Sequence, residues 1–280
     1  MAENISINGV LPLLNVSVSG YYDWRSRKPS KQSLRKSDVK KRIRKIHEES
    51  FEIYGAPKIT AILHKEGVQV SQRTVSTYMK EDDIKAHYRQ KCSITTLNSD
   101  FSSKLIDRLE RNFMPDKPNA VWCTDITYIW TSQDEFVYLT SIMDLYSKKI
   151  IAWELTQTLH VDAVISSVEK ALSRRNLTSP AIIHSDRGSQ YVSRKYKDVL
   201  GGALIASYSR KGNPWDNACI ESFHSVLKRE WLKRYRFATY EDAYKAIFEY
   251  IETFYNTVRI HGSCGYQSPN DYEKQRISAN

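Results

Sequence analysis

Residues 121–129 read Val-Trp-Cys-Thr-Asp-Ile-Thr-Tyr-Ile, an apolar or β-branched run interrupted by one carboxylate, Asp125. Such side chains at successive positions predict a strand that is buried on both faces and lies in the centre of a sheet. A carboxylate at such a position is costly unless a cation or hydrogen bonds satisfy it. Asp125 is therefore the first candidate for a functional residue.

The segments that follow this strand alternate in type. Strands are expected at 136–147, 149–157, 181–184 and 204–209, and helices at 160–174, 193–200, 216–232 and 240–256. Three strands in an antiparallel meander, followed by alternating helices and strands, predict the α/β class with a mixed sheet and helices on both faces.

Two further acids stand at informative places. Asp186 ends the strand 181–184 where the chain turns into Arg-Gly-Ser-Gln, and ligands of α/β sheets gather beyond strand ends. Glu221 lies in the first turns of a helix whose predicted buried stripe is Ile220, Phe223, Leu227 and Trp231. Carboxylates are the ligands Mg²⁺ prefers, and two such ions about 3.5–4 Å apart clamp the attacking and leaving oxygens of a phosphoryl transfer.

The N-terminal part predicts a helix-turn-helix. Helical spacing of apolar residues is expected over 36–50, 57–66 and 72–81, with Gly67 ending the second helix and Ser71 capping the third. The second helix of such a motif enters the major groove, which makes Gln72, Arg73, Ser76 and Thr77 candidates for contacting bases. The alternative is a small helical bundle without DNA contact.

A basic run precedes this motif. Residues 25–45 contain eleven Lys and Arg residues against one acid, and the whole chain carries a net charge of +10. One-sign clustering favours phosphate contacts, with Lys40, Lys41, Arg42 and Arg44 as the candidates, over a merely solvated helix face.

Other features narrow the class of protein. No segment has the length of a membrane span, and residues 10–22 lack the basic flank of a signal peptide. The cysteines Cys92, Cys123, Cys219 and Cys264 are far apart and predict isolated reduced thiols. We therefore expect a cytoplasmic protein that has no membrane partner.

The domain organisation expected from these patterns has four parts. They are a basic lead-in over 1–35, a helix-turn-helix domain over 36–88, a polar linker over 89–118 and a catalytic core over 119–276.

Several motifs resemble those of one family, the second-frame (orfB-type) transposases of bacterial insertion sequences. These motifs are Trp122-Cys-Thr-Asp-Ile-Thr-Tyr128, His184-Ser-Asp-Arg-Gly-Ser-Gln-Tyr191, Ser209-Arg-Lys-Gly-Asn213, Trp215-Asp-Asn217, Glu221-Ser-Phe223, Leu227-Lys228, Tyr255-Asn-Thr-Val-Arg-Ile-His261 and Gly265-Tyr-Gln-Ser-Pro269. The resemblance covers nearly the whole chain, since the segment from Ser19-Gly-Tyr-Tyr through the helix-turn-helix is also similar.

The resemblance implies a retroviral-integrase (DDE) core with an RNase H-like fold. Asp125, Asp186 and Glu221 would be the catalytic residues and would hold two Mg²⁺ (or Mn²⁺) ions. Lys228 matches a position that contacts the terminal DNA. The remaining matches, expected to support the site rather than to bind metal, are His184, Asn217, Arg259 and His261.

The reaction implied is cleavage of a phosphodiester at the element's end, followed by attack of the freed 3′-hydroxyl on a second phosphodiester. One end joining near the other would give a circular intermediate. The implied partners are double-stranded DNA (terminal inverted repeats and target), further copies of the chain on that DNA, and the product of an upstream frame. The protein would lie in the bacterial cytoplasm, associated with the nucleoid when bound to DNA.

Two departures from the family pattern are visible. The interval between Asp186 and Glu221 is one residue short, around Gly201-Gly202, and a surface loop can absorb this. Cys264 replaces a leucine, which should affect only packing. Three alternatives stay open: a hydrolytic nuclease of the same fold, a non-catalytic DNA-binding regulator from a decayed element, and a glycosidase with paired carboxylates, against which the basic charge argues.

Overall fold

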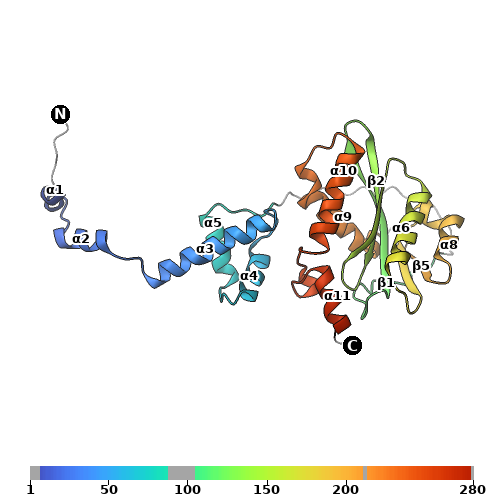
Figure 1. Ribbon diagram of the computed structural model, residues 1–280, viewed down its shortest axis with the longest axis horizontal. Coiled ribbons are helices and arrows are strands. Elements are labelled where there is room, and N and C mark those ends of the chain that lie inside the picture. Colours follow the sequence, from blue (N-terminus) through green and yellow to red (C-terminus); the bar gives the residue numbers. More distant parts are fainter. Residues whose placement is uncertain (1–6, 88–104, 211–212, 279–280) are drawn as a thin grey trace. The chain divides into compact units, whose positions relative to one another are not determined.

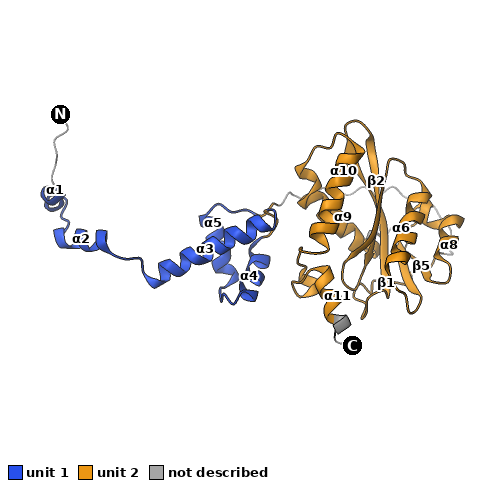
Figure 2. Ribbon diagram, in the orientation of Figure 1, with its two compact units in different colours: residues 1–51, 55–85 blue, residues 52–54, 86–280 orange. Residues whose placement is uncertain are grey.

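The computed structural model describes residues 7–87, 105–210 and 213–278 of the chain. The chain forms two compact units, one of residues 1–51 and 55–85 and the other of residues 52–54 and 86–280 (Figure 2). The first unit is helical and the second is built on a mixed sheet (Figure 1). Residues 89–104 of the expected linker, with Cys92, lie outside the described residues.

The described part of the helical unit contains α1 (Ile7–Leu13), α2 (Val18–Ser26), α3 (Lys31–Glu49), α4 (Ala56–Lys65) and α5 (Gln72–Glu81). The sequence did not predict α2, and α3 begins five residues earlier than expected. The reason lies at Ser30, whose hydroxyl accepts a hydrogen bond from the amide of Ser33 at 3.1 Å and so caps a longer helix.

The predicted helix-turn-helix is present in α4 and α5. Gly67 follows α4 with a φ of +79°, a conformation that glycine adopts without strain. The hydroxyl of Ser71 accepts from the amide of Thr74 at 3.1 Å and caps α5. The three longest helices pack on one another through Val39, Ile43, Ile46, Ile59, Leu63, Val75 and Met79, all of which are buried.

The second unit contains one five-stranded sheet in the order β3-β2-β1-β4-β5. The strands are β1 (Val121–Thr131), β2 (Glu135–Asp144), β3 (Ile150–Thr156), β4 (Ala181–Ser185) and β5 (Leu204–Tyr208). The first three pair antiparallel, while β4 pairs parallel with β1 and with β5. The predicted mixed sheet, with the strand that carries Asp125 in its centre, is confirmed.

Helices cover both faces of this sheet (Figure 1). They are α6 (Val161–Arg174), α7 (Ser189–Val192), α8 (Arg194–Leu200), α9 (Ala218–Glu230), α10 (Tyr240–Phe248) and α11 (Pro269–Ser278), with short 3₁₀ segments at Pro214–Asn217, Leu232–Arg234 and Gly262–Cys264 and a π-helical segment at Glu249–Tyr255 that continues α10. In Figure 1, α6 and α8 lie on one side of the strands and α9 and α10 on the other.

The long hairpin of β1 and β2 extends beyond its parallel neighbour. β4 pairs with β1 only over Val121–Cys123, so β1 continues from Thr124 without a strand on that side. The tip of the hairpin is held elsewhere, because the amides of Ser132 and Gln133 donate to the carbonyls of Phe237 and Ala238 at 3.0 and 2.9 Å. These bonds fix the far end of the hairpin to the segment before α10.

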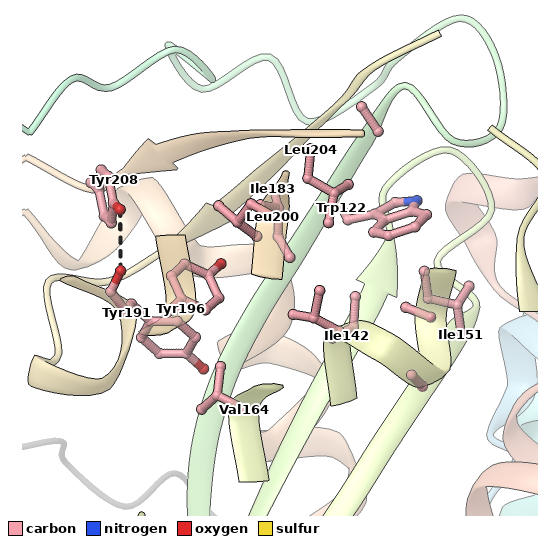
Figure 3. Close-up of a cluster of buried hydrophobic side chains, with 14 residues drawn as sticks. Trp122, Ile142, Ile151, Val164, Ile183, Tyr191, Tyr196, Leu200, Leu204 and Tyr208 are labelled. Atoms are coloured by element: carbon pink, nitrogen blue, oxygen red, sulfur yellow. Dashed lines mark hydrogen bonds between the residues drawn. The ribbon is translucent and has the colours of Figure 1, made fainter. Parts of the chain in front are cut away.

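The main core lies between the sheet and the helices α6 to α8 (Figure 3). Trp122 on β1 is fully buried among aliphatic side chains of β2, β4 and α6. At the other end of the cluster, the Tyr208 hydroxyl donates to the carbonyl of Tyr191 at 3.1 Å. This core and the β1–β4 pairing fix the first residues of β1 relative to the carboxyl end of β4.

Two observations concern the cysteines and the length of the helices. Cys123, Cys219 and Cys264 are free thiols, as expected. Within the described ranges, no helix has the length and apolar character that crossing a membrane requires.

Candidate active site

Asp125 lies in the middle of β1, directly across from Ser141 of β2. It points to the face of the sheet on which α9 packs, and its side chain is 19% exposed. A half-buried carboxylate on a central strand is one of the positions at which charge must be compensated.

Asp186 directly follows β4, at the carboxyl end of that strand. The amide of Gly188 donates to its Oδ1 at 2.9 Å, and a Cβ atom at position 188 would lie 3.0 Å from the same oxygen. Burial raises the pKa of the Asp186 carboxyl to about 6, and the charge of Asp125 adds to that rise. The glycine therefore lets the backbone approach the carboxylate closely.

Glu221 lies in the first turn of α9, whose residues Ile220, Phe223 and Leu227 are buried as predicted. Burial raises the pKa of its carboxyl to about 7, and Asp125 and then Asp186 raise it further. Asp125 thus makes ionisation of the other two less favourable, and Asp186 does the same for Glu221. The three carboxylates, from β1, the end of β4 and α9, lie close enough together to repel one another.

The surroundings of the three acids offer little compensating charge. Within the described residues, no lysine or arginine nitrogen lies within 4 Å of these carboxylates. Nor does any set of three or more His, Cys, Asp or Glu side chains in this part of the chain form a ready metal-binding group. The site is thus a cluster of under-neutralised acids, not a preassembled cage.

His224 is the basic side chain that contacts Asp125 among the described residues. It lies one helical turn after Glu221 on α9, is buried, and places Nδ1 3.4 Å from Oδ2 of Asp125. Its Nε2 lies 3.3 Å from the hydroxyl of Ser141, the residue that pairs with Asp125 across the hairpin. The imidazole therefore restrains one oxygen of the Asp125 carboxylate.

Lys228, two turns after Glu221, extends toward β1. Its ammonium lies 4.7 Å from the ring centroid of Tyr128, at cation–π distance. Burial lowers the pKa of Lys228, while Asp125 raises it and Lys233 lowers it further. Lys228 is thus an ammonium within electrostatic reach of the acids, not a freely solvated lysine.

Asn217 connects the start of α9 to β1. Its side chain is buried and its amide donates to the carbonyl of Thr124 at 3.3 Å, one residue before Asp125. The Oδ1 atom of the same side chain has no hydrogen-bond partner among the described residues. A buried amide oxygen without a donor is an acceptor that a ligand or water can satisfy.

His184 is fully buried between β4 and β5. Its Nδ1 lies 2.9 Å from the hydroxyl of Ser207 and its Nε2 lies 3.2 Å from that of Ser209. Burial lowers its pKa, which favours the neutral imidazole. These contacts are those of a side chain that joins two strands.

Arg259 and His261 belong to a second buried group at the far end of α9. Arg259 donates to both oxygens of Glu230 at 2.7 and 2.6 Å, and the ring of His261 lies against the same guanidinium. The Tyr250 hydroxyl also donates to Glu230 at 2.9 Å. Since Glu230 ends α9, this group holds the helix that carries Glu221 at its other end.

The candidate base-contacting residues of the helical unit lie together. Gln72, Arg73, Ser76 and Thr77 all occupy the exposed side of α5, opposite the buried Val75. The first two are at the N-terminal end of the helix. A helix that enters a groove with its N-terminal end would present these side chains first.

The basic run is partly neutralised within the unit. Lys40 and Arg44 pair with Asp82 at 2.7 and 2.9 Å, and Arg42 pairs with two acids, one on α3 and one at the end of α4. Lys41, in contrast, lies on the exposed side of α3. Three of the four phosphate-contact candidates thus have acidic partners, most of them from helices that follow the run in sequence.

His224 is the functional candidate that the sequence analysis missed. Helical periodicity could have found it, because a residue three positions after Glu221 lies on the same side of a helix. The contact of its ring with Ser141 depends on strand register and has no such local signal.

Comparisons with known proteins agree with this fold. Two models described as "Integrase core domain" match residues 115–214 and 204–269, and one described as "HTH-like domain" matches residues 34–91. The class defined by the sheet and its carboxylates is therefore that of proteins with an integrase core.

Curated relatives specify the family further. The chain is 36% identical over 259 residues to a "Transposase for insertion sequence element IS904" of Lactococcus lactis, covering 89% of this chain and 98% of that protein. It is 31% identical over 277 residues to the "Transposase InsF for insertion sequence IS3A" of Escherichia coli, covering 98% and 96%. The chain belongs to the family of insertion-sequence transposases with an integrase core.

Solved structures are more distant. The HTLV-2 integrase catalytic core domain, solved in complex with magnesium, has a TM-score of 0.44 and 16% identity, covering 56% of this chain and 98% of that one.

Proposed function

We propose that this protein cleaves DNA at the ends of an insertion sequence and transfers the cleaved strand to a second site, with Asp125, Asp186 and Glu221 as the catalytic residues. One observation carries the proposal: three carboxylates converge from β1, β4 and α9 with no lysine or arginine nitrogen within 4 Å among the described residues, and the charge of Asp125 adds to the raised pKa of both Asp186 and Glu221. Such acids attract divalent cations.

The donor set fits Mg²⁺ or Mn²⁺. Carboxylate oxygens are hard ligands, and the unpartnered Oδ1 of Asn217 adds a neutral acceptor beside Thr124. When bound, two such ions would neutralise charge on the phosphodiester and lower the pKa of the attacking oxygen. Asp125, Asp186 and Glu221 would hold them, and His224 would keep the Asp125 carboxylate oriented.

The reaction consists of two displacements at phosphorus. In the first, a water oxygen bonds to the phosphorus and the bond to the 3′ oxygen breaks, leaving a 3′-hydroxyl and a 5′-phosphate. In the second, that 3′-hydroxyl loses its proton, attacks another phosphodiester and releases that strand's 3′-hydroxyl. One ester replaces another, so no ATP and no covalent protein intermediate are required. The protein contributes positioning and charge neutralisation.

DNA recognition is assigned to the helical unit. Gln72 and Arg73 begin the exposed side of α5, and their side chains suit adenine and guanine edges respectively. Lys41 would contact phosphate directly. Lys40, Arg42 and Arg44 would have to leave their acidic partners in order to contact phosphate. Lys228 would contact the DNA end beside the acids. Assembly of several copies on the two ends of an element belongs to the same proposal.

The test uses a duplex with the element's own terminal repeat, a labelled 3′ end and Mg²⁺. Asp125→Asn, Asp186→Asn and Glu221→Gln should each reduce cleavage and joining by at least about a thousandfold while DNA affinity changes little, because charge neutralisation supplies most of the catalysis. Asp198→Asn, at an exposed position on α8, is the matched control.

The products distinguish the rival functions. Hydrolysis without joined products would identify a nuclease of the same fold. Binding without cleavage by the unmodified chain would identify a non-catalytic regulator. Near-normal joining by any one of the three variants would remove that residue from the catalytic set.

A further inference from the structure

The outer part of the β1–β2 hairpin carries three large aromatic side chains in the open. Tyr128, Trp130 and Phe136 are 60%, 56% and 43% exposed. Trp130 lies across from Phe136 in the hairpin register, so both rings point to the same face, and Tyr128 lies two residues away on that face. We call these three residues the hairpin platform.

The rings of the hairpin platform contact one another edge to face. The centroids of Trp130 and Phe136 are 4.9 Å apart at 74°, and those of Tyr128 and Phe136 are 5.3 Å apart at 84°. Contacts of this geometry order the rings, while most of their surface stays in water. The hairpin itself is anchored at its tip by Ser132 and Gln133, so the platform is built on a fixed support.

Exposure of these rings is a local departure from the rest of their sheet face. Nearer the start of β1, Trp122 and Thr124 point to the same face and are fully buried in the core shared with α6. The packing that buries this face ends before Tyr128. A contiguous group of exposed aromatic rings on a soluble fold indicates a surface that binds something.

A cation connects the platform to the acids. The ammonium of Lys228 lies 4.7 Å from the centroid of the Tyr128 ring, and Lys228 belongs to α9, the helix that also carries Glu221. One side of the platform thus meets a positive charge, and that charge lies within electrostatic range of the proposed catalytic carboxylate. Aromatic faces beside a lysine match a ligand with flat rings and a negatively charged backbone.

We propose that the hairpin platform binds unpaired nucleobases of the DNA end, with Lys228 on the adjoining phosphate. Bases inside a duplex are already stacked on their neighbours, so exposed protein rings select bases that have left the helix. Asp125 points to the other face of the hairpin, toward α9, but β1 has no neighbouring strand on one side beyond Cys123, so a DNA strand seated here can pass Lys228 around that open edge toward the acids. This inference rests on the proposed function and adds that the protein receives an opened, not a fully paired, DNA end.

The experiment measures stacking without chemistry. The full chain, with metal removed by chelator, is titrated into a duplex whose 3′ single-stranded tail contains 2-aminopurine, and into a blunt duplex in which 2-aminopurine is paired. Stacking on aromatic rings should quench the tail fluorophore and leave the paired one unchanged. Affinity for the tailed duplex should exceed that for the blunt duplex.

Variants assign the effect to the platform. Trp130→Leu and Phe136→Leu should each weaken binding of the tailed duplex by about tenfold and abolish its quenching, with little change for the blunt duplex. Trp130→Phe keeps a ring and should retain most of the affinity, which excludes a folding defect as the cause. The control is Phe248→Leu, because Phe248 is 47% exposed on α10, away from the platform.

Two outcomes would overturn the proposal. Equal losses on tailed and blunt DNA would mean that the platform reads no unpaired base. A Trp130→Leu chain that changes from oligomer to monomer in sedimentation without DNA would mean that a second copy occupies the face. Because stacking is measured without metal, the two proposals can fail separately. A protein that cleaves DNA but does not quench the tail fluorophore would contradict the platform alone. A protein that quenches the tail fluorophore but does not cleave DNA would contradict the proposed function alone.

Discussion

Two clusters of buried acids lie in the same sheet unit, and they are compensated differently. At the end of β2, Asp144 meets Arg175 at 3.0 Å, and Arg175 also donates to both oxygens of Glu273 on α11 at 3.0 and 2.5 Å. Burial raises the pKa of Asp144 to about 6, but Arg175 and the amides of Asn119 and Tyr146 oppose the rise. Burial also acts to raise the pKa of Glu273, but Arg175, with help from Ser147 and Lys149, outweighs it, and the pKa of Glu273 is lowered.

The cluster of Asp125, Asp186 and Glu221 lacks such compensation. Burial and the charge of Asp125 both raise the pKa values of Asp186 and Glu221, and among the described residues the basic side chain in contact with the cluster is the imidazole of His224. The difference teaches that buried acids alone do not mark a site. Acids that an arginine neutralises brace the fold, whereas acids left to repel one another fit our proposal that they bind a cation.

The largest expected effect comes from breaking the cluster of Asp144, Arg175 and Glu273. Arg175→Met leaves Asp144 and Glu273 buried without a cation and should lower the free energy of unfolding by about 3–5 kcal/mol. Urea unfolding of the full chain measures this, with Arg194→Met on the exposed side of α8 as the control. A loss no larger than the control's would show that the cluster does not brace the core.

The next effect concerns the contact that orients Asp125. His224→Phe keeps the ring volume but removes both nitrogens, and should raise the Mg²⁺ concentration for half-maximal binding about tenfold, since partners that orient ligands tune metal affinity. Calorimetric Mg²⁺ titration measures it, and affinity for DNA should not change. Ser225→Ala, on the exposed side of α9, is the control. Unchanged Mg²⁺ affinity in His224→Phe would reduce the contact to packing.

A pH series sharpens the comparison for the under-neutralised acids. The folded-state pKa values of Asp186 and Glu221, about 6 and 7, exceed their ordinary values. Without metal, their protonated forms favour the folded state at low pH, and this contribution is lost as the pH rises through about 6 and 7. Metal must displace these protons, so Mg²⁺ affinity should be about tenfold lower at pH 6 than at pH 8.

Thermal unfolding with Mg²⁺ and with chelator at pH 6, 7 and 8 checks this. In the unmodified chain, the Mg²⁺-induced rise in Tm should be larger at higher pH. In Glu221→Gln this rise should be smaller than in the unmodified chain. A rise that is the same at all three pH values would contradict the raised pKa values.

The smallest expected effect concerns two cations on α3, Lys41 on the exposed side and Arg44, which pairs with Asp82. Lys41→Ala should lower the slope of log affinity against log salt by about 0.9, the value of one phosphate contact. Arg44→Ala should lower it less, because Arg44 already has Asp82 as a partner. The measurement is binding of a random-sequence duplex at several salt concentrations. Equal slopes for Arg44→Ala and Lys41→Ala would mean that the ion pair opens freely on DNA.

The sequence predicted features that depend on neighbours along the chain. The strand around Asp125, the cap at Ser71 and the buried side of α9 follow from alternation, capping and helical spacing, and all three are present. Three acids were proposed from their positions at a strand centre, a strand end and a helix start. The structure brings these acids into electrostatic contact, and their catalytic role stays a prediction.

What the sequence did not predict depends on distant partners. The contact of His224 with Ser141 joins positions 83 residues apart, and the pairing of Lys40 with Asp82 joins positions 42 apart. A local count of charges therefore described residues 25–45 as almost purely basic, although later helices supply acids to them. The hairpin platform is likewise exposed because the core shared with α6 ends before Tyr128. The spacing of apolar residues along the chain does not reveal where that packing ends.

The pairing of Arg175 with Glu273 has a consequence for the order in which the protein is made. The two residues are 98 positions apart, and β2 with Asp144 is synthesised earlier still. On the ribosome, the sheet around Asp144 can form long before Glu273 has emerged, so the arginine lacks its second acid for most of synthesis. A chain interrupted before α11 would keep a sheet with an incompletely satisfied buried charge, and such a product should open readily and fall to proteases.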